Sequence, residues 1–136
     1  MKSVINASAE NYLETIYELS QMQSEVRSID VANELGFKKS SVSVAMKNLR
    51  EKEYITVDSS GFLHLTDAGK QIAEMIHERH ELLKSWFMRL GVPEEIASAD
   101  ACKLEHAISD TSFEAIKNHM MQYGDDKKTH FEEAKE

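Results

Sequence analysis

Residues 28–50 carry two short helical patterns joined by a tight turn that contains Gly36, and this arrangement restricts the fold more than any other feature. Ser28 is expected to cap a segment from Ile29 to Leu35, and Gly36 follows where a helix C-terminus favours a left-handed residue. The apolar residues of the next segment recur at i, i+3, i+4 and i+7: Val42, Ala45, Met46 and Leu49. Two short helices joined by a tight turn are typical of a helix-turn-helix.

Two short strand patterns follow, at residues 54–57 and 62–65, on either side of a turn that ends in Gly61. Thr66 is placed to cap a long helix that keeps apolar spacing up to Gly91. The order helix, turn, helix, strand, turn, strand predicts a winged helix within residues 1–70.

The remaining segments are predicted to be helical. A first helix is expected from Ala9 to Gln21 with Ser8 as its N-cap, and another from Ala101 to Ile108. A last helix should stop at Gly124. The predicted fold is therefore mainly α: an N-terminal winged helix-turn-helix over residues 1–70, an all-helical domain over 71–124, and a charged, solvated tail over 125–136.

The acidic residues are not spread evenly along the chain. The formal net charge of -8 argues at first against a nucleic-acid partner. Residues 38–52, however, contain five basic residues and one acidic residue, a local charge of +4. No apolar run approaches the ~18 residues of a membrane span, and no export signal is recognised, so a cytoplasmic location is expected.

The outer face of the second short helix suits the major groove of DNA. Hydroxyl and amide groups can bond base edges, an aliphatic side chain can touch a thymine methyl, and basic side chains can reach guanine or phosphate. The candidate base and groove contacts are Ser40, Ser41, Ser43, Val44, Lys47, Asn48 and Arg50. Lys38 and Lys39 are candidate phosphate contacts. The alternative is that this face is an ordinary solvated helix surface, but the order of helices and strands favours DNA binding. The wing residues Ser59, Ser60 and His64 are weaker candidates for DNA contacts.

Cys102, Glu105 and His106 stand at i, i+3 and i+4, so on a helix they share one face and can hold one cation. Cys102 is the only cysteine, and a structural or reactive thiol remains an alternative to a ligand. Other helices offer further candidate ligands: His80, Asn11 and Glu14.

These segments together resemble the diphtheria toxin repressor family of metal-dependent regulators. The similarity is carried by residues 11–17, the helix-turn-helix and wing, residues 78–83, and residues 102–106. It implies a metal-dependent transcriptional repressor that binds double-stranded operator DNA as a homodimer. The chain has no room for the SH3-like third domain of longer iron-type members, so its architecture is similar to the short, manganese-type branch.

The resemblance also implies roles for the candidate ligands. Cys102, Glu105 and His106 match primary metal positions of the iron-type form, and Glu14 and His80 match positions of the manganese-type branch. Asn11 departs from the family, which usually has Met or Asp there. The ancillary site of iron-type members is expected to be incomplete, because Lys84 and Ser98 occupy its Glu and His positions. One well-formed site per subunit is expected; a thiolate ligand favours Fe(II), with Mn(II) as runner-up.

Part of the apolar surface on the long helix is assigned to a dimer interface, with the chain's own core as the alternative. The residues assigned are Leu83, Trp86, Phe87 and Leu90. Two rival functions remain: a winged-helix regulator that senses a small organic ligand or binds DNA constitutively, and a metalloenzyme. The sequence contains no Gly-rich phosphate loop, HExxH pair or nucleophile elbow, so an enzyme is not expected.

Overall fold

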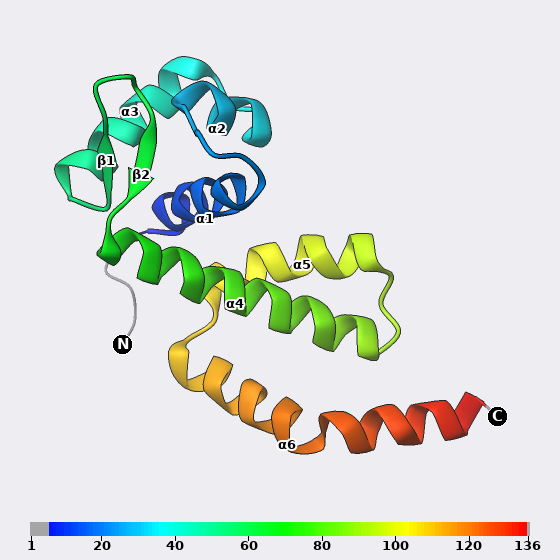
Figure 1. The fold of residues 1–136 in the computed structure, drawn as a ribbon. Coiled ribbons are helices and arrows are strands. Elements are labelled where there is room, and N and C mark those ends of the chain that lie inside the picture. The colour runs from blue at the N-terminus through cyan, green and yellow to red at the C-terminus, as the bar shows by residue number, and fades with distance from the viewer. Residues whose placement is uncertain (1–5, 136) are drawn as a thin grey trace. The chain divides into compact units, whose positions relative to one another are not determined.

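A computed structural model describes residues 6–135, with side chains to residue 122. The chain divides into two compact units, one ending at His77 and the other beginning at Glu78, so the boundary lies within one long helix. The elements, labelled in Figure 1, are α1 (Ala7–Met22), α2 (Ser28–Leu35), α3 (Lys39–Glu51), β1 (Ile55–Val57), β2 (Leu63–Leu65), α4 (Asp67–Arg89), α5 (Glu94–Ala107) and α6 (Asp110–Lys135). The predicted winged helix followed by helices is confirmed.

Helix α1 begins earlier than predicted because Asn6, and not Ser8, is its N-cap. The Asn6 side-chain oxygen accepts a hydrogen bond from the Ala9 backbone N–H at 2.8 Å, and Ser8 lies inside the helix. Asn and Ser cap helices about equally well, so the position of the extended residue decides between them. Asn6 has that extended backbone.

Helix α2 starts at Ser28, so the prediction that Ser28 caps it is wrong. Arg27 is the N-cap, and the Asp30 carboxylate accepts a hydrogen bond from the Arg27 backbone N–H at 2.8 Å. At the other end Gly36 has φ 68°, the left-handed conformation expected there. The turn between α2 and α3 therefore depends on glycine.

One hydrophobic core holds the first unit together, and α1, α2, α3 and the β1–β2 hairpin all contribute to it. The predicted apolar face of α3 is confirmed, because Val42, Met46 and Leu49 are buried. The other buried members are Tyr12, Leu13, Ile16, Leu19, Val26, Val31, Ala32, Ile55, Leu63 and Ala73.

The wing is a two-stranded antiparallel hairpin in which Ile55 pairs with Leu65 and Val57 with Leu63. Asp58 closes its turn by accepting hydrogen bonds from the backbone N–H groups of Ser60 (2.9 Å) and Phe62 (3.0 Å). The predicted wing is thus confirmed, with each strand shorter by a residue.

In the second unit, α5 begins at Glu94, seven positions before the predicted start at Ala101. Pro93 precedes it, and acidic residues in the first turn suit the positive end of the helix dipole. The buried residues of its first turns are small, Ala97 and Ala101, so apolar spacing gave a weak signal.

Helix α6 continues to Lys135, so the predicted stop at Gly124 is wrong for the described backbone, and the solvated or frayed tail stays a prediction. A single glycine costs a helix only about 1 kcal/mol relative to alanine, and helices tolerate it. The described side chains of this unit pack around Leu83, Ala97, Ala101 and Phe113. Within residues 6–135 no helix combines the length and apolar character needed to cross a bilayer.

Candidate metal centre and DNA-binding surface

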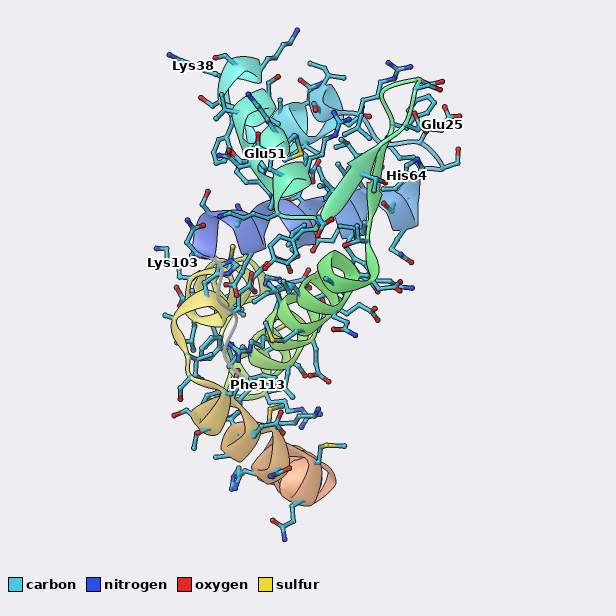
Figure 2. The ribbon with its side chains drawn as sticks, turned by 90° about the vertical axis from the view of Figure 1, so that its left-hand side faces the viewer. Glu25, Lys38, Glu51, His64, Lys103 and Phe113 are labelled. Carbon is cyan, nitrogen blue, oxygen red and sulfur yellow. The ribbon has the colours of Figure 1, made fainter. Side chains whose placement is uncertain are left out.

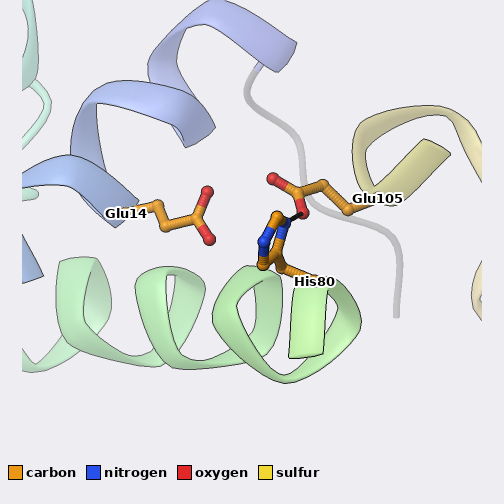
Figure 3. A group of neighbouring side chains, drawn as sticks. All are labelled: Glu14, His80 and Glu105. Carbon is orange, nitrogen blue, oxygen red and sulfur yellow. Dashed lines mark hydrogen bonds and ion pairs between the residues drawn. The ribbon is translucent and has the colours of Figure 1, made fainter. Parts of the chain in front are cut away.

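Glu105, fully buried near the end of α5, is bracketed by two histidines of the second unit. Its Oε2 lies 2.8 Å from His80 Nδ1 on α4, the hydrogen bond drawn in Figure 3. Its Oε1 lies 3.3 Å from Nε2 of the adjacent His106. A carboxylate shielded from water needs partners of this kind, and imidazole with carboxylate is a common ligand set for divalent metals.

Arg79 fixes the backbone that carries Glu105. Its Nη1 donates hydrogen bonds to the carbonyl oxygens of Glu105 (3.1 Å) and Ile108 (2.9 Å), and its Nη2 forms an ion pair with Asp110. The guanidinium therefore joins α4 to the end of α5 and the start of α6. Arg79 is not among the site residues predicted from the sequence, although a basic residue within the apolar pattern of a long helix was a usable signal.

Ser98 adds a hydroxyl to the same neighbourhood, because its Oγ lies 3.4 Å from His80 Nε2. Both ring nitrogens of His80 thus face polar groups of α5. At the position where the resemblance leads one to expect a histidine ligand, this chain has a weaker oxygen donor.

Cys102 lies on α5 one turn before Glu105, but its thiol is exposed whereas Glu105 is buried. Among the described residues, the groups of carboxylate, thiol and imidazole atoms that converge within metal-binding range do not include its sulfur. The role of Cys102 as a ligand therefore stays a prediction, and the alternative of a buried structural thiol does not fit its exposure.

The first unit contains the two other predicted ligands, both on α1. Glu14 is 5% exposed, and Asn11 is half-buried. The Asn11 backbone carbonyl accepts a hydrogen bond from the Thr15 hydroxyl at 2.8 Å, which leaves its side-chain amide as the possible donor to a metal. Asn11 and Glu14 stay predictions as ligands.

The outer face of α3 is exposed along its length, as a surface that reads DNA must be (Figure 2). Val44 is 60% exposed although it is aliphatic, whereas Val42, Met46 and Leu49 of the same helix are buried. The remaining predicted contacts are exposed too: Lys38, Lys39, Ser40, Ser41, Ser43, Lys47, Asn48 and Arg50.

In the wing, the His64 side chain contacts a neighbouring carboxylate. Its Nε2 lies 3.0 Å from Asp58 Oδ2. This hydrogen bond, with that from the Phe62 backbone N–H, holds the pKa of the Asp58 carboxyl below its usual value. The acidic partner makes His64 a poorer phosphate contact than an isolated histidine.

The predicted dimer residues differ in exposure. Leu83 is completely buried within the chain and packs in its core, so it has no surface for a partner. Trp86 and Phe87 are half-buried, with ring centroids 5.7 Å apart, and Leu90 is 61% exposed.

Comparison with known families covers most of the chain. Residues 5–61 match the family description "Iron dependent repressor, N-terminal DNA binding domain". Residues 66–130 match "Iron dependent repressor, metal binding and dimerisation domain".

Individual relatives agree with these matches. The chain is 34% identical to the HTH-type transcriptional regulator MntR of Bacillus velezensis, over 94% of this chain and 89% of that protein. It is 32% identical to an uncharacterised HTH-type transcriptional regulator of Methanocaldococcus jannaschii, over 89% of this chain and 98% of that protein.

Solved structures share the fold. A manganese-dependent transcriptional repressor in complex with manganese superposes with a TM-score of 0.76 at 28% identity, over 82% of this chain and 52% of that one. The IdeR protein of T. acidophilum, at 24% identity, has a TM-score of 0.73 over 91% of this chain and 56% of its own. The chain thus spans about half the length of these two proteins. By its sequence relatives and both domain matches, the chain belongs to the iron-dependent repressor family, the diphtheria toxin repressor family that its motifs resemble.

Proposed function

We propose that this chain is a cytoplasmic transcriptional repressor that binds operator DNA as a homodimer when it carries a divalent cation, and so controls metal homeostasis. The observation that carries the proposal is the buried Glu105 carboxylate paired with His80 and His106, in a chain whose other unit is a winged helix. In the proposal, the domain of residues 1–70 binds DNA, and the domain of residues 71–124 binds metal and forms the dimer.

The proposed ligands are Glu105, His106 and His80, with Glu14 and the weaker Asn11 as further ligands, and Cys102 stays a candidate. Cation binding sets the spacing of the two α3 helices in the dimer. That spacing must match half-sites about 34 Å apart, or a multiple of this. Metal and DNA then stabilise the same state, and each strengthens binding of the other.

Helix α3 enters the major groove. The exposed Val44 supports this role, because an aliphatic side chain in the middle of a polar face can contact a thymine methyl. Lys38 and Lys39, at the start of the helix, contact phosphates, and Lys47 and Arg50 reach guanine or phosphate. The exposed Leu90, with Trp86 and Phe87, forms part of the dimer interface.

For the metal, the described structure supports Mn(II) ahead of Fe(II), the reverse of the preference drawn from Cys102. The ligands that converge on Glu105 are carboxylate and imidazole, which suit Mn(II), while the thiol that favours Fe(II) is exposed. The manganese-dependent repressor among the structural relatives supports the same choice.

The proposal is tested by fluorescence anisotropy on the promoter of the chain's own gene, with Mn(II), with anaerobic Fe(II) and with chelator. The parent should bind tightly only with metal, and the Glu105→Ala/His106→Ala variant should bind weakly in every condition. The control variant Glu95→Ala/His119→Ala changes the same residue types at exposed positions of the same unit and should respond as the parent does. If chelator leaves the operator affinity unchanged, the result would instead support a regulator that binds DNA constitutively or senses a small organic ligand.

Cys102→Ser distinguishes the two metal choices. If the thiol is not a ligand, the variant keeps the Mn(II) affinity of the parent, and Co(II)-loaded parent shows no thiolate-to-metal charge-transfer absorption in the near ultraviolet. A strong charge-transfer band that disappears in Cys102→Ser would restore Fe(II) as the first choice.

A further inference from the structure

A row of carboxylates runs along α1 of the DNA-binding unit. Glu10, Glu14 and Glu18 lie at i, i+4 and i+8, so they stand one above another on a single face. Like charges at this spacing destabilise a helix, and α1 contains no lysine or arginine to offset them. Glu10 and Glu14 are also at least nine-tenths buried. Such an arrangement favours a bound cation.

A histidine from another helix of the same unit faces this row. His77 lies on the first half of α4, with its Nδ1 3.7 Å from Glu18 Oε1 and its ring centroid 5.6 Å from that of Tyr17. This nitrogen is shielded from solvent, and within the described structure it makes no hydrogen bond. A buried nitrogen at 3.7 Å from a carboxylate oxygen is too distant for a hydrogen bond, but suitably placed to share a metal ion with it.

The ligand atoms of Glu14, Glu18 and His77 all lie within 4.8 Å of one another. Two ligands bonded to one cation at about 2.1 Å can be at most about 4.2 Å apart. Small rotamer changes therefore suffice to close the group around an ion. All three residues belong to the unit that ends at His77, so the group does not depend on the placement of the second unit.

We propose that Glu14, Glu18 and His77 form a second divalent-cation site, inside the DNA-binding unit and separate from the Glu105 centre. Two carboxylates and one imidazole suit Mn(II), Fe(II) or Zn(II), and the site contains no thiol that selects softer metals. A cation there joins α1 to the middle of α4, within the DNA-binding unit.

The new site shares Glu14 with the metal centre proposed above, and only in this respect does it rest on that function. Occupation of one site alters the position of the shared carboxylate and therefore the affinity of the other. Glu18 and His77 have no role in the Glu105 centre, so changes at these two residues test the new site alone.

The first experiment removes the Glu105 centre and follows His77 directly. In the Glu105→Ala/His106→Ala variant, Zn(II) is titrated at constant pH while the ring nitrogens of the histidines are observed by ¹⁵N NMR. We expect the Nδ1 resonance of His77 to move in a saturable manner with added Zn(II). A His77 resonance that stays in place up to a large excess of Zn(II) would overturn the proposal, whatever the outcome at the Glu105 centre.

The second experiment counts bound metal by equilibrium dialysis of the full chain against Mn(II). Glu18→Gln and His77→Gln should each bind one equivalent fewer than the parent at saturating Mn(II), whereas Glu34→Gln and His119→Gln, at exposed positions, should match the parent. Equal stoichiometry in all five proteins would show that the contact between Glu18 and His77 is an ordinary ion pair. The side chains of Glu18 and His77 are 44% and 37% exposed, so both variants should fold, which circular dichroism checks.

Discussion

At the scale of single residues, the second unit contains two buried ionisable residues, Arg79 and Glu105, and the Arg79 side chain donates a hydrogen bond to the backbone carbonyl of Glu105. Burying a charge is costly unless hydrogen bonds and opposite charges compensate. Arg79 meets this condition through two carbonyl oxygens and Asp110, and one of these carbonyls belongs to Glu105 itself. The same guanidinium therefore stabilises the unit and positions the candidate metal ligand.

Replacing Arg79 should show both effects. Arg79→Met leaves Asp110 and two carbonyl groups without their donor, and we expect the free energy of unfolding to fall by about 3 kcal/mol. Chemical denaturation measures this, and Arg89→Met, at an exposed position near the end of α4, serves as the control. The Mn(II) affinity of folded Arg79→Met should also fall, because the backbone of Glu105 is released. Unchanged stability and affinity would contradict this role.

The wing offers a prediction about pH. His64 lowers the pKa of Asp58 from 3.8, so the carboxylate favours the folded wing above the unfolded pKa, and this contribution is lost as the pH falls through the folded pKa. In His64→Ala the largest cause of the shift is absent. The Asp58 pKa, followed by carboxyl ¹³C NMR, should therefore rise toward 3.8; a midpoint identical to that of the parent would contradict the assignment.

At the scale of elements, a close contact joins the wing to α4. Thr66 caps the helix, its hydroxyl accepting a hydrogen bond from the Gly69 N–H at 3.2 Å. Gly69 lies directly against the backbone carbonyl of Tyr54, just before β1, so that a Cβ at this position would overlap the carbonyl oxygen. The position needs glycine for space rather than for its conformational freedom.

Gly69→Ala should therefore lower the stability of the protein, although alanine has the higher helix propensity. An ordinary Gly→Ala change inside a helix stabilises it by about 1 kcal/mol, but here we expect a loss of about 1–3 kcal/mol from the backbone clash. Thermal and urea unfolding measure the difference. Lys70→Ala, at the next and exposed position, should change stability little, and a more stable Gly69→Ala protein would show that the contact is not close.

At the scale of the whole molecule, the chain combines a DNA-binding unit with a unit whose family match includes dimerisation. Recognition of a two-fold operator requires two copies of α3 at a set spacing. In the proposed dimer, exposed apolar residues near the end of α4 and the start of α5 can contribute to the interface: Met88, Leu90 and Ile96. In the proposal, the dimer and not the isolated chain is the state whose DNA affinity depends on metal.

A charge at this surface should separate folding from assembly. Leu90→Glu places a carboxylate at a 61% exposed position, so the monomer should fold, while the dimer dissociation constant should rise at least tenfold. Sedimentation velocity should show the loss of the dimer, and fluorescence anisotropy should show the accompanying loss of operator binding. Met22→Glu, at a 78% exposed position of the other unit, should remain a dimer. If the Leu90→Glu protein remains a dimer, the interface does not include Leu90.

Much of the architecture could be predicted from the sequence because it depends on local patterns. The buried face of α3, the left-handed Gly36, the wing turn and the Thr66 cap each follow from apolar spacing or turn chemistry over a few residues. The spacing of Glu105 and His106 belongs to the same class of signal. Local patterns were less reliable at helix ends, where Asn6 and Ser8 are nearly equivalent caps and where α6 continues through Gly124.

Only the tertiary structure decided which polar groups meet, because those contacts join residues far apart in the chain. It paired His80 with Glu105, buried Arg79 against the end of α5, left Cys102 exposed and brought His77 to Glu18. Spacing within one helix determines which side chains share a face, but the burial of that face and its partners depend on packing between helices. For this reason the sequence alone identified candidate ligands, and the fold determined which of them converge.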